Sequence, residues 1–144
     1  MPPKKSTKKY PFDVVNGEWI KKKIEEKGLT RKEVYEYMGI SERTLSNYIT
    51  ESKSMSNLRK SAFYYFLNND KSNTNKEDLN KVTPIWLSNY IDSLGIKNDA
   101  FGEYFGTRSQ EISGLRKGRL EMSTIRKVAF LGFFYLTKNK HSFF

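Results

Sequence analysis

A stretch of twenty residues decides the fold: Leu29-Thr-Arg-Lys-Glu-Val-Tyr-Glu-Tyr-Met-Gly-Ile-Ser-Glu-Arg-Thr-Leu-Ser-Asn-Tyr48. Thr30 and Glu33 have the spacing of a capping box, so we expect a helix to begin here. Gly39 should end that helix in the left-handed conformation, and Ser41 should cap the next one. The stretch therefore predicts two short helices joined by a tight turn.

Helical periodicity continues on both sides of this stretch. Apolar residues recur three or four positions apart, and no segment alternates apolar and polar residues with the period of a strand. We therefore predict an all-α chain. The apolar faces of the expected helices lie within 19–24, 34–38, 45–49, 58–66, 86–94, 101–105, 112–115 and 125–134.

The sequence also repeats itself after 67 positions. Residues 19–68 and 86–135 align without a gap and share 14 identities in 50 positions, where about three are expected by chance. Trp19 pairs with Trp86, and both are expected to anchor the first helix of a module in its core. We interpret the repeat as two tandem modules of four to five helices. The predicted divisions are a basic arm (1–10), a first module (11–69), a polar linker (70–82), a second module (83–137) and a tail (138–144).

The chain is strongly basic, with 26 Lys and Arg against 16 Asp and Glu and a formal net charge of +10. The excess is concentrated in residues 1–9 and 83–144, which carry +4 each. A chain of this kind attracts a polyanion, either nucleic acid or an anionic membrane surface.

The composition excludes several classes of protein. The chain has no cysteine and one histidine, His141, which argues against thiolate catalysis, zinc fingers and histidine-based triads. No Gly-rich phosphate loop or convergent acid–base group is evident, so we expect no enzymatic activity, no cofactor and no metal site. No apolar run reaches the length of about 20 residues that spans a membrane, and the basic N-terminus lacks the apolar segment of a secretory signal. We therefore expect a cytoplasmic protein without a membrane partner.

Residues 29–48 resemble the helix-turn-helix of the lambda-repressor/Cro (XRE-like) family, and residues 96–115 look like a more diverged copy. The resemblance implies a lambda-repressor-like fold for each module and a transcriptional regulator that binds double-stranded DNA sequence-specifically. The expected form is a repressor of phage or mobile-element style, in the bacterial cytoplasm and associated with the nucleoid. Two modules in one chain would replace the usual dimer and reach major-groove faces about 34 Å apart.

The resemblance also implies roles for individual residues. Groove-facing positions are implied for Ser41, Glu42, Arg43, Ser46, Asn47 and Thr50 in the first copy and for Arg108, Ser109, Gln110, Ser113, Gly114 and Lys117 in the second. Phosphate contacts are implied for Arg31, Lys32, Lys97, Arg116 and Arg119, and structural turns for Gly39 and Gly106. Arginine can pair with guanine, and glutamine or asparagine with adenine. We expect the second copy to make the stronger DNA contact, with Gly114 allowing close approach to the DNA backbone.

Each copy departs from the family pattern. Where the two helices touch and a small residue is usual, the first copy has Tyr35 and the second has Gly102. After the turn glycine the second copy has Thr107 in place of an apolar residue. Tyr35 and Glu42 permit an alternative function, in which the scaffold binds a protein partner as a phage-type inhibitor or antirepressor. A sequence-independent DNA coater is the third and weakest alternative.

The sequence allows two interpretations for each of three segments. The basic arm either enters a groove of DNA or is a solvated tail. The repeated Arg-Lys pairs at 59–60 and 126–127 either bind phosphate or form an exposed helix face. The apolar segment 130–136, with the terminal Phe pair 143–144, either closes the gap between the modules or forms a homodimer seam.

Overall fold

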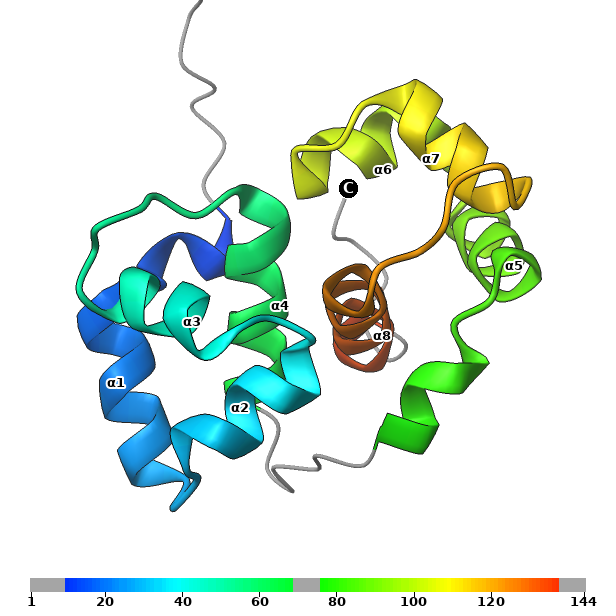
Figure 1. The fold of residues 1–144 in the computed structure, drawn as a ribbon. Coiled ribbons are helices and arrows are strands. Elements are labelled where there is room, and N and C mark those ends of the chain that lie inside the picture. Colours follow the sequence, from blue (N-terminus) through cyan, green and yellow to red (C-terminus); the bar gives the residue numbers. More distant parts are fainter. Residues whose placement is uncertain (1–9, 69–75, 138–144) are drawn as a thin grey trace, which may run out of the picture.

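The computed structural model describes residues 10–68 and 76–137 of the chain (Figure 1). Within these residues every regular element is helical and none is a strand, which confirms the predicted all-α class. The α-helices are α1 (Gly17–Glu26), α2 (Arg31–Met38), α3 (Glu42–Ile49), α4 (Asn57–Leu67), α5 (Pro84–Leu94), α6 (Asn98–Phe105), α7 (Ser109–Arg116) and α8 (Thr124–Thr137). Two 3-10 helices, η1 (Pro11–Val14) and η2 (Lys76–Lys81), precede α1 and α5.

No helix in the described ranges is long and apolar enough to cross a membrane. The interpretations of residues 1–9 and of the terminal Phe pair 143–144 concern residues outside the described ranges, as does the predicted tail over 138–144, which contains His141.

Local capping produces the first helix pair as predicted. The Thr30 hydroxyl accepts a hydrogen bond from the Glu33 amide at 3.1 Å, and the Glu33 carboxylate accepts one from the Thr30 amide at 3.0 Å. Gly39 follows α2 with φ +71°, and the Ser41 hydroxyl accepts from the amide of Thr44 at 3.0 Å. These bonds satisfy backbone donors that the start of a helix leaves unpaired. Capping therefore sets the ends of α2 and α3.

The second helix pair, α6 and α7, has the same turn with different caps. Gly106 follows α6 with φ +65°, in the left-handed region that glycine adopts without steric cost. The residues before α6 and α7, Lys97 and Arg108, make no side-chain capping bond. The helices α6 and α7 begin 67 positions after α2 and α3. The turn is therefore kept, while basic side chains stand where the first pair has polar caps.

The 67-residue register extends further toward the N-terminus than the identities indicate. Phe12 and Val15, in and beside η1, are buried, and so are Leu79 and Val82, which follow them by 67 positions. The exposed linker expected over 70–82 is thus packed in its second part, where η2 contacts α8. Two apolar side chains three positions apart lie on one face of a 3-10 turn and are enough to bury it.

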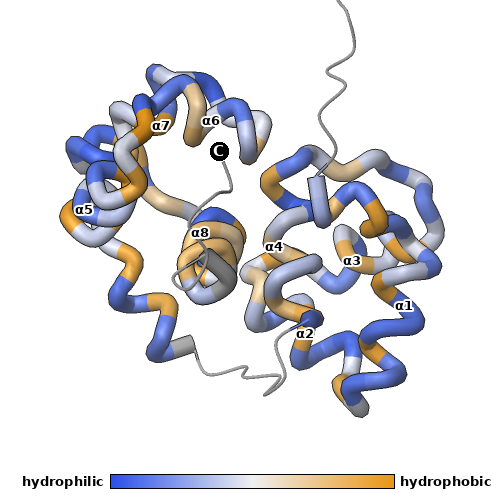
Figure 2. Tube along the Cα trace, turned by 180° about the vertical axis from the view of Figure 1, so that it is seen from behind, coloured by the Kyte–Doolittle hydropathy of each residue, from blue (hydrophilic) through white to orange (hydrophobic). Residues whose placement is uncertain are grey.

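The helices α4 and α8 lie side by side at the centre, with the other helices on either side of them (Figure 1). Figure 2 shows hydrophobic residues along α8 in the middle of the molecule. Phe63 of α4 is fully buried, as are Phe130 and Phe133 of α8. The apolar C-terminal segment therefore closes the gap between the two halves of the chain, which is one of its two interpretations.

Both tryptophans pack against the core, as expected. The Trp19 ring stacks on Tyr64 with centroids 6.1 Å apart, and the Trp86 ring lies 5.4 Å from that of Phe134. These contacts join α1 to α4 and α5 to α8, so the tryptophans anchor the first α-helix of each half.

Contacts between the halves come in matching pairs. We call residues 67 positions apart counterparts. A Cβ on Gly39 would lie 2.6 Å from the Thr124 Cβ, and a Cβ on Gly106 would lie 3.3 Å from the Asn57 Cβ. The two glycines are counterparts, and so are Asn57 and Thr124. The helix contacts match in the same way, because α2 contacts α8 and α4 contacts α6. Reciprocal contacts of this kind are those of a two-fold interface.

Glu51 is the one non-glycine residue with positive φ in the described part of the chain, at +60°. Its counterpart Gly118 has φ +74°, so the second half uses the residue that adopts this conformation without strain. We expect Glu51→Gly to raise the free energy of unfolding by about 0.5–1 kcal/mol, because relief of strain outweighs the entropy of a glycine in the unfolded chain. Urea denaturation measures this change. Gly118→Ala is the control and should lower the free energy of unfolding. A Glu51→Gly variant that is less stable than the unaltered chain would contradict backbone strain at Glu51.

Candidate nucleic-acid interface

The helix α3 turns its apolar side inward and its polar N-terminal edge outward. Leu45 and Tyr48 are buried at 1% and 4% exposure. Arg43, Ser41 and Glu42 at the start of the helix are exposed, while Ser46 and Asn47 are half-buried. The edge formed by residues 41–43 is therefore the part of α3 that can enter a groove.

The two residues that flank α3 have hydroxyls with intramolecular partners. The Ser41 Oγ accepts the Thr44 amide and lies 2.8 Å from the Thr44 Oγ1. The Thr50 hydroxyl donates to the Ser46 carbonyl at 3.0 Å and lies 2.7 Å from the Ser52 Oγ. These groups shape the ends of the helix, which leaves Glu42, Arg43 and Asn47 as the longer polar side chains able to contact bases.

The helix α7 presents a similar edge with different side chains. Arg108, Ser109 and Gln110 are exposed at its start, Lys117 is exposed just after its end, and Ser113 is half-buried. This edge carries two cations and an amide, and amide and guanidinium groups are those that form bidentate contacts with adenine and guanine.

Gly114 does not lie on this edge. It is buried, and a Cβ there would lie 2.9 Å from the Leu120 Cδ1. The close approach that we expected Gly114 to make with DNA is therefore made with the loop of its own chain, because α7 and the loop after it fold back on each other.

The two helix pairs also differ in how closely their helices pack. A Cβ on Gly102 would lie 2.3 Å from the Thr107 carbonyl oxygen. Tyr35 occupies the same position in the first pair and is half-buried. Accordingly α6 and α7 contact each other more extensively than α2 and α3 do. The second pair has the close helix contact that a small residue permits, and the first pair is more open.

Comparison with known protein families supports this geometry for the first pair. Residues 20–60 match the helix-turn-helix family model. The match runs from α1 into the start of α4 and includes the turn at Gly39. It indicates a DNA-binding regulator of transcription. No curated protein and no solved structure matches the chain.

Some of the basic side chains around the helix-turn-helix and around α6–α7 are exposed, and others are bonded to side chains of the same protein. The exposed ones expected to contact phosphate are Arg31, Lys32, Lys97 and Arg119. The Lys32 Nζ lies 3.9 Å from a Glu36 carboxylate oxygen, but both side chains are more than half exposed, so this ion pair contributes little and leaves the lysine accessible.

Arg116 is occupied by partners within the chain. Its guanidinium donates to the Asp92 and Asn98 side-chain oxygens at 2.6 Å each and to the Ser88 hydroxyl at 3.1 Å. The Arg116 side chain is 19% exposed. It therefore ties α7 to α5 and α6, and its guanidinium is engaged within the chain where a phosphate contact was expected.

The repeated arginines Arg59 and Arg126 fasten the last helix of each half to α3 or α7. Arg59 donates to the Tyr48 hydroxyl, with its guanidinium 5.6 Å from the centre of that ring. Arg126 donates to the Glu111 carboxylate at 2.8 Å. Neither interpretation of these residues, phosphate contact or exposed face, describes these contacts. Sequence reasoning missed them because the partners lie 11 and 15 positions away and differ between the halves.

The Arg126 bond also changes the charge of the α7 edge. It compensates Glu111, whereas Arg108 and Lys117 remain exposed. At the α3 edge, Arg43 stands next to the exposed carboxylate of Glu42. The α7 edge is therefore the more positive of the two, which favours its contact with a phosphate backbone.

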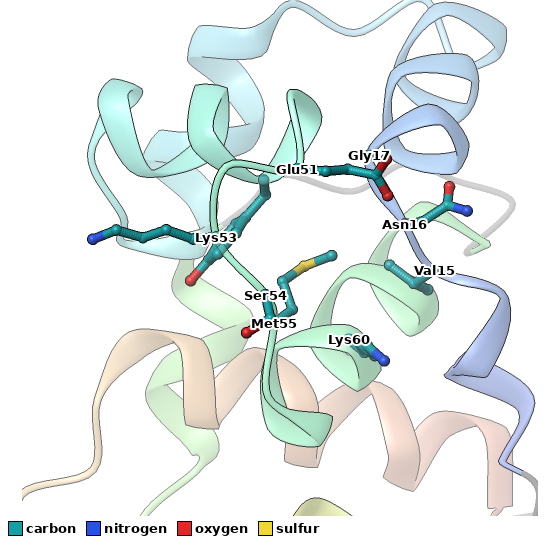
Figure 3. A pocket seen from close by; sticks show the side chains of 9 residues that line it. Val15, Asn16, Gly17, Glu51, Lys53, Ser54, Met55 and Lys60 are labelled. Carbon is teal, nitrogen blue, oxygen red and sulfur yellow. The ribbon is translucent and has the colours of Figure 1, made fainter.

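A pocket of about 300 Å³ opens between the N-terminus of α1 and the loop after α3 (Figure 3). Its walls are apolar at Val15 and Met55 and charged at Glu51, Lys53 and Lys60. In the described part of the chain no group of three or more acidic or histidine side chains could hold a metal ion. The charges in the pocket are of both signs and point to no ligand. Lys53 nevertheless adds an exposed cation just beyond α3, which sequence reasoning missed.

Proposed function

We propose that this chain is a sequence-specific regulator of transcription that binds double-stranded DNA through α3 and α7 as a pseudo-dimer. It acts as a repressor of phage or mobile-element style, in the bacterial cytoplasm and associated with the nucleoid. The observation that carries the proposal is the set of reciprocal contacts, in which Gly39 meets Thr124 and Gly106 meets Asn57. A two-fold arrangement of two such helices matches the two-fold symmetry of paired half-sites in DNA.

The two half-sites should differ in sequence. The edge of α3 has Ser41, Glu42 and Arg43, where the edge of α7 has the counterparts Arg108, Ser109 and Gln110. Arginine forms its best bidentate contact with guanine and glutamine with adenine. An imperfect palindrome, with guanine opposite Arg43 and adenine opposite Gln110, is therefore the target.

The remaining base contacts are assigned to residues beside these edges. Ser46, Asn47 and Ser113 are half-buried there, and Lys117 is exposed just after the end of α7. Phosphate contacts are assigned to Arg31, Lys32, Lys97 and Arg119, which are exposed. Such contacts set the position of the protein on the duplex without reading bases.

The test is a selection of bound sequences from a randomised duplex pool at moderate salt. Two unlike half-sites about one helical turn apart are the expected result. A single half-site would contradict the pseudo-dimer. No enrichment, with binding lost as salt is raised, would leave only non-specific attraction to phosphate and would favour the alternative of a protein-binding inhibitor or antirepressor.

A further inference from the structure

Tyr65 of α4 and Gly132 of α8 are counterparts that touch each other. A Cβ on Gly132 would lie 2.5 Å from the Tyr65 Cβ and 3.4 Å from its Cγ. In a two-fold interface, a position contacts its own counterpart only close to the axis. The pair therefore marks the axis of the reciprocal contacts between the halves.

The missing side chain at Gly132 determines how closely the two central helices approach. Carbon atoms in contact lie about 3.5–4.0 Å apart, so a Cβ at 2.5 Å from that of Tyr65 cannot be accommodated without movement. An alanine at position 132 would have to push α8 away from α4 by about 1 Å. The two helices have the most extensive contact in the described chain, so this movement would be passed on to both halves.

Tyr65 is also held from the other half. It is 6% exposed, and its hydroxyl lies 2.6 Å from that of Tyr104 on α6. Its ring lies 5.8 Å from that of Phe133. Burial raises the pKa of Tyr104 to about 12 and raises that of Tyr65 as well, so both hydroxyls stay protonated and one donates to the other. Because α6 leads through Gly106 into α7, this bond connects α4 to the second helix pair.

Each of the two DNA-facing helices is fastened to its own central helix. The bond from Arg59 to Tyr48 joins α4 to α3, and the bond from Arg126 to Glu111 joins α8 to α7. A change in the separation of α4 and α8 should therefore change the separation of α3 and α7.

We propose that Tyr65 and Gly132 are positioning residues that set the separation of α3 and α7, and with it the half-site spacing that the chain accepts. The claim about half-site spacing rests on the proposed function, whereas the claim about the separation of α3 and α7 concerns the protein alone. The tyrosine and the glycine act as a complementary pair, in which one supplies the bulk and the other the space.

The separation of α3 and α7 can be measured directly, because the chain has no cysteine of its own. Spin labels on Arg43→Cys and Gln110→Cys would occupy exposed counterpart positions on the two helices. Pulsed electron resonance then gives the distribution of distances between the labels in the full chain. We expect Gly132→Ala to shift the mean distance by about 1 Å or more and to widen the distribution. Tyr65→Phe, which removes only the hydroxyl, should widen it without loss of folding.

Ile20→Val is the matched control, since it weakens the buried core of the first half without adding atoms at the axis. It should leave the distance distribution unchanged. If Gly132→Ala and Tyr65→Phe also leave it unchanged, the positioning role is wrong, whatever the protein does with DNA.

Gly132→Ala and Tyr65→Phe, each made in the chain that keeps Arg43 and Gln110 and carries no label, test the link to DNA in the duplex selection. We expect Gly132→Ala to keep the base preferences of each half-site, to change their spacing, and to bind the original spacing about tenfold more weakly. An altered label distance with an unaltered spacing would overturn that link. If the label distance changes but the unaltered protein selects no DNA at all, the positioning role stands and the proposed function fails.

Discussion

Replacement of Gly102 by alanine is expected to lower the free energy of unfolding by about 3 kcal/mol. The new Cβ would lie 2.3 Å from the Thr107 carbonyl oxygen and 3.3 Å from the Ile112 Cγ1. The closer of these atoms belongs to the backbone of the turn between α6 and α7, so relief requires this turn to move away from α6 rather than a side chain to rotate. Urea denaturation followed by tryptophan fluorescence measures the change, assuming a two-state transition.

The sign of this result is informative because glycine is a poor helix former. In an open helix interior, the same substitution would stabilise the protein by about 1 kcal/mol. A more stable Gly102→Ala variant would therefore contradict the close contact between Gly102 and the turn that follows α6. Asn89→Ala, at an exposed position of α5, is the control and should change the stability by less than about 0.5 kcal/mol.

Substitution of both Arg108 and Gln110 by alanine is expected to weaken binding to the selected DNA about 100-fold. Both side chains are exposed at the start of α7, so the free energy of unfolding should change little. The loss should fall on one half-site, and the base preference of the half-site read by α3 should remain. Gel-shift titration against duplexes altered in each half-site separately measures this.

The control for the Arg108/Gln110 double variant removes a positive charge and an amide at positions outside α7. Lys21→Ala with Asn89→Ala deletes one positive charge and one amide from exposed positions of α1 and α5. It should reduce affinity slightly and equally for all duplexes, since it affects only long-range attraction. An unchanged sequence preference in the Arg108/Gln110 variant would exclude α7 from base reading.

The helices could be predicted because their ends depend on neighbours in the sequence. Thr30 and Glu33 cap each other across three positions, and Gly39 ends α2 through its own conformational freedom. These interactions need no tertiary contact, so pattern and spacing were sufficient for them. The same reasoning holds for the exposed edges of α3 and α7, because burial of every third or fourth residue leaves the other side of a short helix to solvent.

The errors arose where distant residues meet. Gly114 was assigned to the DNA-facing edge, but Leu120 folds over it. Arg116 looked like a free cation at the end of α7, but Asp92 and Asn98 reach it from two other helices. No spacing rule gives such contacts, because they depend on how whole helices lie against one another.

The sequence by itself determined the all-α class, both ends of α2 and the start of α3, the turns at Gly39 and Gly106 and the basic character of the chain. Each of these depends on residue type or on interactions within one turn of helix. Only the tertiary structure decided that α4 and α8 pair at the centre, that Leu79 and Val82 are buried, and that Tyr65 meets its counterpart Gly132. Those outcomes are set by close packing between distant segments, where the absence of one Cβ decides how near two helices can lie.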